Sequence, residues 1–254
     1  MKRKLIPIAA AVFAALFAVS TIMLWRQDTQ QKQGEETFQK VAALLQTEPP
    51  AVEEEAAEQP ITAAEKYGDV QKQNPDFVGW LSIPGTAIHY PVMQTVDRPD
   101  YYLKRDFDGA YSSHGTPYLQ ENCMVGTSDN LVIYGHNMKN GSMFADLCKY
   151  KEEAFYREHS TIHFDTMEGF GTYEIVAVFQ TVAYSQEGFK YYHFANAADE
   201  ASFDEYVASC KALALYDTGA DAQYGDRLIT LSTCEYSRTN GRMVVVAKLV
   251  ESHA

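Results

Sequence analysis

The sequence predicts a mostly β domain, built as an antiparallel or mixed β-barrel with helices attached, behind one N-terminal membrane-spanning helix. Three observations lead to this prediction. From about Thr62 onward, short runs rich in branched and aromatic residues alternate with turn dipeptides, which is typical of the strands of a barrel. Clear helical spacing is confined to two stretches of that region. A single long apolar run, residues 5–25, lies ahead of it.

The composition excludes several classes of protein. The chain has 254 residues, of which 46% are hydrophobic and 22% charged, so it is not disordered throughout. Its net charge of -13 argues against duplex nucleic acid as a partner, because neutralising phosphates needs a basic surface. Four cysteines are too few for a disulfide framework, and one apolar run excludes a multi-pass membrane protein.

The first expected element is a transmembrane anchor over residues 5–25. This run carries no charge, and at about 1.5 Å per residue its helix covers the ~30 Å hydrocarbon core. Lys2, Arg3 and Lys4 precede it, so residues 1–4 are expected in the cytoplasm and the rest outside the cell. A cleaved signal peptide is the alternative, but the run is long and its end is bulky.

Residues 26–62 are expected to form an extracellular acidic stalk, and residues 63–254 the folded domain. Apolar residues between positions 38 and 45 recur at helical spacing, which favours one short amphipathic helix within the stalk. The glutamates of residues 53–58 lie among prolines and few large apolar residues. Such a stretch cannot offset the entropy of ordering its chain, so it is interpreted as a solvated spacer.

The elements of the folded domain follow from its patterns in order. The expected helices are residues 63–73, stopped by Asn74-Pro75, and residues 203–215, whose apolar positions recur at helical spacing. The expected strands are residues 78–83, 88–93, 130–134, 172–182, 228–234 and 243–250.

The last two expected strands position the candidate chemistry. The Asn240-Gly241 turn dipeptide between them favours a hairpin, which brings Cys234 near Arg242. Cross-strand neighbours have Cβ atoms only ~5 Å apart. The alternation places Ile229 and Leu231 on a core face, and the opposite face ends in polar residues, as the rim of a site would.

The remaining cysteines have a simpler interpretation. Cys123, Cys148 and Cys210 are expected to be small buried hydrophobic residues, with one disulfide among them left open. His159 and His163 have the i, i+4 spacing of a metal pair on a helix, but their neighbours favour a strand. No metal or other cofactor is therefore predicted.

Cys234, His136 and Arg242 each have a role in acyl transfer. His136 directly follows a buried-looking strand and Gly135, a rigid place from which to aim an imidazole. A thiol with the ordinary pKa of about 8.5 is only a few per cent ionised at pH 7, and a nearby guanidinium favours the thiolate. The guanidinium also stabilises an oxyanion, while the imidazolium can protonate a leaving amine.

Three separated motifs resemble those of the sortases. The run Thr-Leu-Ser-Thr-Cys that ends at Cys234, followed by Arg242, looks like the Cys-bearing strand pair of that family. The segment 134–144 around His136 is similar to the His-bearing segment of class B sortases. Residues 74–86 and Tyr90-Pro91-Val92 resemble the entry region of that class.

The resemblance implies an eight-stranded β-barrel with N-terminal helices and one helix before the Cys-bearing strand. It implies a membrane-anchored extracellular transpeptidase that cleaves a C-terminal sorting signal of secreted proteins after Thr. The acyl group passes to an amine of the peptidoglycan precursor or, in polymerising members, of a pilin subunit. By motif match, the catalytic residues are Cys234 as nucleophile, His136 as acid/base and Arg242 as oxyanion and substrate ligand. The residues expected to bind substrate are Ser232, Thr233, Glu235, Leu103 and Tyr134.

Two departures from the family pattern leave questions open. Some class B sortases have a longer loop than the step from Cys234 to Arg242, so Arg238 is an alternative guanidinium, although it lies in mid-loop. Arg98-Pro99 occupies a position where some relatives carry an Asn that contacts substrate, so the preferred signal is expected to differ from the NPQTN type.

Three other families and functions fit less well. A papain-like peptidase places its Cys before its His, which is the reverse of the order here. An L,D-transpeptidase is suggested by Ser113-His114-Gly115, but that family needs a Cys next, where Thr116 stands. A membrane-anchored adhesin without catalysis would need no Cys, His and Arg set, and selective labelling of Cys234 by a vinyl sulfone would distinguish the two.

Overall fold

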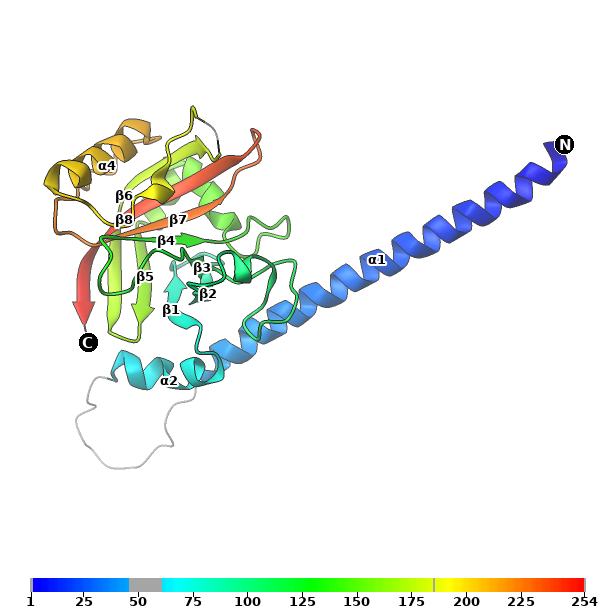
Figure 1. Ribbon diagram of the computed structural model, residues 1–254, viewed down its shortest axis with the longest axis horizontal. Helices are drawn as coiled ribbons and strands as arrows, with labels where there is room; N and C mark the ends of the chain where they lie inside the picture. Colours follow the sequence, from blue (N-terminus) through cyan, green and yellow to red (C-terminus); the bar gives the residue numbers. More distant parts are fainter. Residues whose placement is uncertain (1, 46–60, 185, 254) are drawn as a thin grey trace, which may run out of the picture.

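A computed structural model describes residues 2–45, 61–184 and 186–253. Eight strands close into a barrel in the order β1-β2-β3-β4-β7-β8-β6-β5 (Figure 1). The strands are β1 (Phe77–Ser82), β2 (His89–Met93), β3 (Tyr118–Leu119), β4 (Asn130–Tyr134), β5 (Thr161–Thr166), β6 (Phe170–Val182), β7 (Leu228–Cys234) and β8 (Gly241–His253). The mostly β class and the eight-stranded barrel are confirmed.

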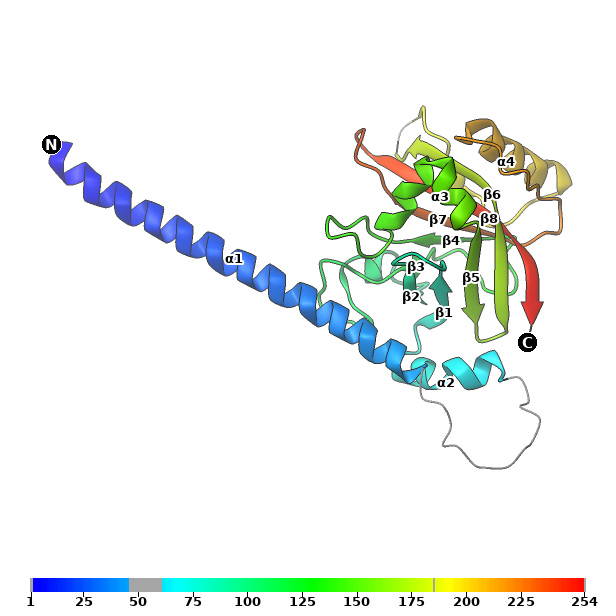
Figure 2. The ribbon, with the colours of Figure 1, turned by 180° about the vertical axis from the view of Figure 1, so that it is seen from behind.

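The described residues also form four α-helices and three short 3-10 helices. The α-helices are α1 (Lys2–Leu44), α2 (Ala63–Gln73), α3 (Glu153–Glu158) and α4 (Glu200–Leu213), and the 3-10 helices are η1 (Tyr101–Lys104), η2 (Ala145–Lys151) and η3 (Tyr191–His193). Most of α1 extends away from the barrel (Figures 1 and 2). Figures 1 and 2 show α2 beneath β1 and β5, with α4 near the other end of the barrel. The two sequence-predicted helices of the domain are confirmed, with α4 shifted a few residues towards the N-terminus.

Local sequence explains where α2 and α4 begin. The Thr62 side chain accepts from the Glu65 backbone, and the Glu65 carboxylate accepts from the Thr62 N–H at 2.8 Å, which closes a capping box. Asp199 and Ser202 form the same arrangement at the start of α4. Residue 203, the first apolar residue at helical spacing, therefore marks the interior of α4 rather than its beginning, because the polar cap precedes it.

The register of the central strands determines where the candidate residues of the sequence analysis lie. β4 runs parallel to β7 with Tyr134 opposite Ser232, and β7 runs antiparallel to β8 with Cys234 opposite Arg242. Both faces of these strands are covered, so Val132, Ile229 and Leu231 have no exposed surface. The prediction that Ile229 and Leu231 face the core is confirmed.

The N-terminal segment differs in part from the predicted division into an anchor (residues 5–25) and a stalk (residues 26–62). Residues 26–44, expected at the start of a stalk, continue α1, and Phe38 and Val41 are buried against the folded domain. Phe38 packs edge-on against Tyr90 of β2, with ring centroids 5.4 Å apart. The expected acidic spacer, residues 46–60, lies outside the described residues. In the described part of the chain, no helix combines the length and apolar character needed to cross a membrane.

Candidate active site

His136 and Cys234 lie side by side because β4 and β7 are parallel and end together. Tyr134 and Ser232 are paired in register, and each is followed two residues later by one of the candidates. The Gly135 N–H donates to the Ser232 carbonyl at 3.2 Å, so the alignment continues beyond the last residue of β4. Neighbouring strands are only about 4.8 Å apart. The imidazole therefore starts from the strand position next to the thiol.

Arg242 lies on the other side of Cys234. The hairpin between β7 and β8 pairs the two residues directly, and the Glu235 N–H donates to the Gly241 carbonyl at 2.9 Å to close it. Asn240 has a φ of 56°, the left-handed conformation that the Asn-Gly dipeptide was expected to supply. Residues opposite each other on adjacent strands project from the same face of the sheet. Cys234 therefore lies between Arg242 of β8 and the segment that follows β4, which carries His136.

A cleft of about 750 Å³ opens over these three strand ends. It is lined by all the predicted site residues except Glu235, namely Leu103, Tyr134, His136, Ser232, Thr233, Cys234 and Arg242. Arg238, the alternative guanidinium, is not among the residues that line it. We call His136, Ser232, Thr233, Cys234 and Arg242 the strand-end wall. We call Leu103, Gln120, Tyr184, Tyr191 and Tyr192, which line the cleft from 3-10 helices and connections between strands, the loop wall.

The His136 imidazole is oriented by a backbone carbonyl of the loop wall. Its Nε2 lies 2.7 Å from the Leu103 oxygen. A carbonyl oxygen only accepts, so Nε2 carries a proton in this arrangement. Within the described residues, the His136 ring forms this one hydrogen bond and none to the Cys234 sulfur. The imidazole is thus oriented by the loop wall and not by the thiol.

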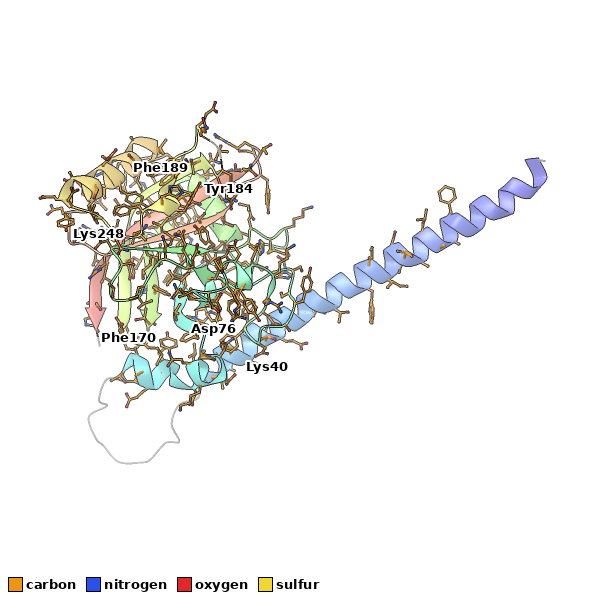
Figure 3. All side chains as sticks on the ribbon, viewed as in Figure 1. Lys40, Asp76, Phe170, Tyr184, Phe189 and Lys248 are labelled. Atoms are coloured by element: carbon orange, nitrogen blue, oxygen red, sulfur yellow. The ribbon has the colours of Figure 1, made fainter. Side chains whose placement is uncertain are left out.

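The Arg242 guanidinium spans from its own strand to the loop wall. One terminal nitrogen donates to the Gly241 carbonyl at 2.9 Å, and the guanidinium carbon lies 5.8 Å from the centre of the Tyr184 ring. Tyr184 has a φ of 59°, which is strained for a residue with a large side chain. Figure 3 shows Tyr184 in the connection after β6, at the end of the barrel away from α2. The guanidinium is therefore held at the cleft by an exposed aromatic ring.

Tyr191 joins the loop wall to the Cys-bearing strand. Its hydroxyl lies 2.6 Å from the Ser232 Oγ, and both side chains are buried. Burial raises the pKa of Tyr191 to about 12, although Ser232 opposes the rise. The phenol is therefore neutral at any physiological pH, and it acts as a hydrogen-bonding partner of Ser232 rather than as a base.

The Gln120 side chain connects Tyr192 to Tyr134 at the end of β4. This residue was not identified from the sequence. Its Nε2 donates to the Tyr192 carbonyl at 2.9 Å, and its Oε1 accepts from the Tyr134 hydroxyl. Gln120 follows β3, a strand of two residues that has too short a pattern to be recognised. Tyr191 and Tyr192 were also missed, although the aromatic-rich stretch around them was visible in a connection between strands.

Glu235 lies behind the site instead of in the cleft. Its side chain is buried, forms an ion pair with Lys151 at 2.6 Å and accepts from the Ser237 N–H. Burial by itself would raise the pKa of this carboxyl, but the hydrogen bonds from Lys151 and Ser237 outweigh it and lower the pKa. The carboxylate therefore secures the start of the β7–β8 turn and has no direct access to a molecule in the cleft.

The other three cysteines are free thiols in unreactive surroundings. Burial raises the pKa of Cys123 to about 11 and that of Cys210 to about 12. Cys148 lies close behind the site, 3.8 Å from the Cys234 carbonyl oxygen, and burial raises its pKa too. A raised thiol pKa means less thiolate, so these cysteines are poor nucleophiles.

Known proteins resemble the chain over this same region. The family model described as the sortase domain matches residues 81–250. A curated relative, sortase B of Listeria monocytogenes, is 37% identical over 187 residues, which cover 72% of this chain and 73% of the relative. The solved structure of sortase B from B. anthracis in complex with AAEK1 has a TM-score of 0.72 at 27% identity, covering 88% of this chain and 99% of that one. A sortase B complexed with triglycine has a TM-score of 0.74 at 25% identity, covering 87% and 99%.

Proposed function

The chain belongs to the sortase family and, within it, to class B, and from that premise we propose the reaction that this cysteine transpeptidase performs. It cleaves the C-terminal sorting signal of secreted proteins after Thr. The cleavage passes through a thioacyl intermediate on Cys234, and the acyl group is transferred to a peptidoglycan amine. Pilin polymerisation is the alternative outcome of the same chemistry, with a different amine as acceptor.

One observation carries this proposal, namely the register of β4, β7 and β8. This register supports a site in which the Cys234 thiol has the guanidinium of β8 on one side and the imidazole of the segment after β4 on the other, with all three residues lining one cleft. A thiolate nucleophile needs a proton donor for the leaving group and a cation for the developing oxyanion. Cys234, His136 and Arg242 meet these needs without any further group.

The first half-reaction forms the thioacyl enzyme. The Cys234 thiolate attacks the carbonyl carbon of the signal's Thr, and the carbonyl oxygen becomes an oxyanion that Arg242 stabilises. The peptide C–N bond then breaks, and the His136 imidazolium gives its proton to the departing amine. The C-terminal part of the signal leaves with a neutral amine, and the enzyme keeps a thioester and a neutral imidazole.

The second half-reaction transfers the acyl group. The acceptor amine attacks the thioester carbon, Arg242 again stabilises the oxyanion, and the His136 imidazole takes the proton that the amine loses. The C–S bond breaks and restores the thiolate and the imidazolium. The sortase B structure complexed with triglycine supports an amine-bearing peptide as acceptor.

The cleft supports binding of an extended peptide between its two walls. Leu103 and Tyr134 contribute apolar surface to its lining, while Ser232 and Thr233 directly precede the nucleophile in sequence. Pro99 and Asp100 line the cleft where a departure from the family pattern was noted, which supports a signal preference different from the NPQTN type. Glu235 contributes through the β7–β8 turn rather than by contact with substrate.

The N-terminal segment is proposed to anchor the enzyme, with residues 1–4 in the cytoplasm and the catalytic domain outside the cell. The uncharged run of residues 5–25 after three basic residues supports this. Phe13, Phe17 and Trp25 are exposed large apolar side chains of that run. After separation of membranes from soluble protein, the full chain is expected in the membrane fraction, resistant to carbonate. Release by carbonate would contradict a spanning anchor.

A peptide-library cleavage assay tests the proposed reaction. The full chain, in detergent, is given extended peptides with a fixed Thr, and cleavage sites are located by mass spectrometry, with Cys234→Ala as the control. Cleavage after Thr that is absent from the control supports the proposal, and no cleavage of any peptide contradicts it. Adding triglycine or a lysine-containing pilin-like peptide then separates the two acceptor classes by the mass of the transfer product.

A further inference from the structure

Hydrogen bonds from the Cys-bearing segment bracket His136 on both sides. The Thr233 hydroxyl donates to the Gly135 carbonyl at 2.7 Å, and the Tyr236 hydroxyl donates to the Asn137 carbonyl at 3.0 Å. The residues just before and just after the histidine are thus each fastened to a residue close to Cys234. The imidazole itself points to Leu103 instead.

Asn137 returns a bond in the opposite direction. Its side-chain Nδ2 donates to the Cys234 carbonyl at 2.9 Å, and the same nitrogen lies 3.2 Å from the Cys148 sulfur. The loop behind it is also closed, because the Phe144 N–H donates to the His136 carbonyl at 2.8 Å and Asn137 pairs with Met143. The amide is therefore held in place, and its donors have defined acceptors.

This side-chain bond replaces a missing rung of the β4–β7 ladder. The last backbone rung runs from the Gly135 N–H to the Ser232 carbonyl. Rungs of a parallel pair recur every second residue, so the next would join the Asn137 N–H to the Cys234 carbonyl. β4 has already ended at Tyr134, and the Asn137 side chain supplies the donor instead. The strand pairing is thus extended past the two candidate catalytic residues.

We propose that Asn137 is a positioning residue that fixes the distance between the His136 imidazole and the Cys234 thiol, with the Tyr236 hydroxyl as its partner. The inference rests on the proposed roles of Cys234 and His136 in the reaction. Asn is suited to this task because it combines a short stem with an amide donor. Asp has the same shape but, when ionised, has no donor and would face the Cys234 carbonyl with a charge.

The test compares Asn137→Ala, Asn137→Asp and Tyr236→Phe with the unchanged chain. Lys139→Ala, an exposed position in the same loop, is the matched control. Turnover of the cleaved peptide gives kcat and KM, and alkylation of Cys234 by iodoacetamide across pH 5–10, located by mass spectrometry, gives the ionisation of the thiol without any substrate.

A misplacement of about 1 Å costs on the order of 100-fold in rate. Asn137→Ala and Asn137→Asp are therefore expected to lower kcat by about 10- to 100-fold while KM stays within about twofold. The pH midpoint of Cys234 alkylation is expected to shift in both. Tyr236→Phe is expected to change kcat and the pH midpoint of alkylation in the same direction, by a smaller factor. Lys139→Ala is expected to change neither kcat nor the midpoint.

Two outcomes would overturn the inference. One is a kcat within twofold of the unchanged chain, with an unshifted alkylation profile, in both Asn137 variants. The other is a loss of kcat in these variants that comes with a lowered melting temperature but leaves Tyr236→Phe and all alkylation profiles unchanged, since that describes a structural role alone. Failure of the proposed function is recognised separately, because the unchanged chain would then cleave no peptide while the alkylation profiles still report on Asn137.

Discussion

The strand-end wall of the cleft differs from the loop wall in what holds its side chains. Cys234 and Arg242 are paired in the backbone register of β7 and β8, and His136 follows two residues after the end of β4, the strand parallel to β7. The loop wall depends instead on side-chain hydrogen bonds, such as those of Gln120 with Tyr192 and Tyr134 and of Tyr191 with Ser232. The comparison teaches that the proposed reacting groups depend on strand register, whereas the loop wall depends on side-chain hydrogen bonds that single substitutions remove.

Loss of the imidazole is expected to have the largest effect. His136→Ala removes the proton donor of the first half-reaction and the base of the second, each typically worth about 10²–10⁴-fold. The fall is expected in kcat, with KM nearly unchanged, because the imidazole acts on the leaving group. Steady-state cleavage of the preferred peptide measures kcat and KM. A large rise in KM with normal kcat would instead mean that His136 binds the peptide and does not transfer protons.

Loss of the guanidinium opposite Cys234 is expected next. Arg242→Ala should lower kcat/KM by about 10²–10³-fold, the typical cost of removing one oxyanion donor. Arg238→Ala is the matched control, because Arg238 lies in the same turn and is not among the residues that line the cleft. Should the Arg238 variant lose activity and the Arg242 variant keep it, the oxyanion role would pass to Arg238.

A smaller and different effect is expected from the loop wall. Gln120→Leu keeps the approximate volume but leaves the Tyr134 hydroxyl and the Tyr192 carbonyl without their partner. It is expected to raise KM by about 3- to 10-fold with kcat within twofold, and to cost about 1–3 kcal/mol of stability. Peptide kinetics and urea unfolding measure the two quantities. A fall in kcat with normal KM would remove the distinction between the walls.

The smallest expected effect concerns the Glu235 carboxylate and appears as a pH dependence of stability. The folded-state pKa of Glu235 is lowered, so its contribution is present above the unfolded-state pKa of about 4.3 and disappears as the pH falls through the folded value. Glu235→Gln is expected to cost about 1–2 kcal/mol at pH 7, because Lys151 is 37% exposed and water screens the pair. Unfolding curves at pH 7 and pH 3 should differ between the two chains only at pH 7. An equal difference at both values would mean that the charge is irrelevant.

The pairing of Cys234 with Arg242 in the strand-end wall could be predicted from the sequence because its causes are local. Branched apolar runs, the Asn240-Gly241 turn and the position of Cys234 at a strand end all have short-range patterns. The parallel pairing of β4 with β7 is a long-range contact that no local pattern reveals, and the place of His136 beside Cys234 therefore rested on the resemblance to sortases.

The loop wall could not be predicted in the same way. Gln120 follows a strand of two residues, and Tyr191 belongs to a 3-10 turn, so neither lies in a periodic segment. Glu235 is next to the nucleophile in sequence, yet its side chain turns to Lys151 of η2, a partner that only the fold brings near. The hydrophobic spacing of Phe38 and Val41 was visible, but nothing in the sequence indicated that these residues pack on the barrel.

Trapping the acyl enzyme tests the central claim most directly, namely that Cys234 is the nucleophile of a cleft it shares with His136 and Arg242. The full chain is mixed with its preferred sorting peptide without an acceptor amine, quenched in acid, digested and mapped by mass spectrometry. The account predicts one thioester adduct, on Cys234, whose mass ends at the Thr of the peptide, and which added amine removes. An adduct on Cys148, Cys123 or Cys210, or cleavage that persists in Cys234→Ala, would contradict it.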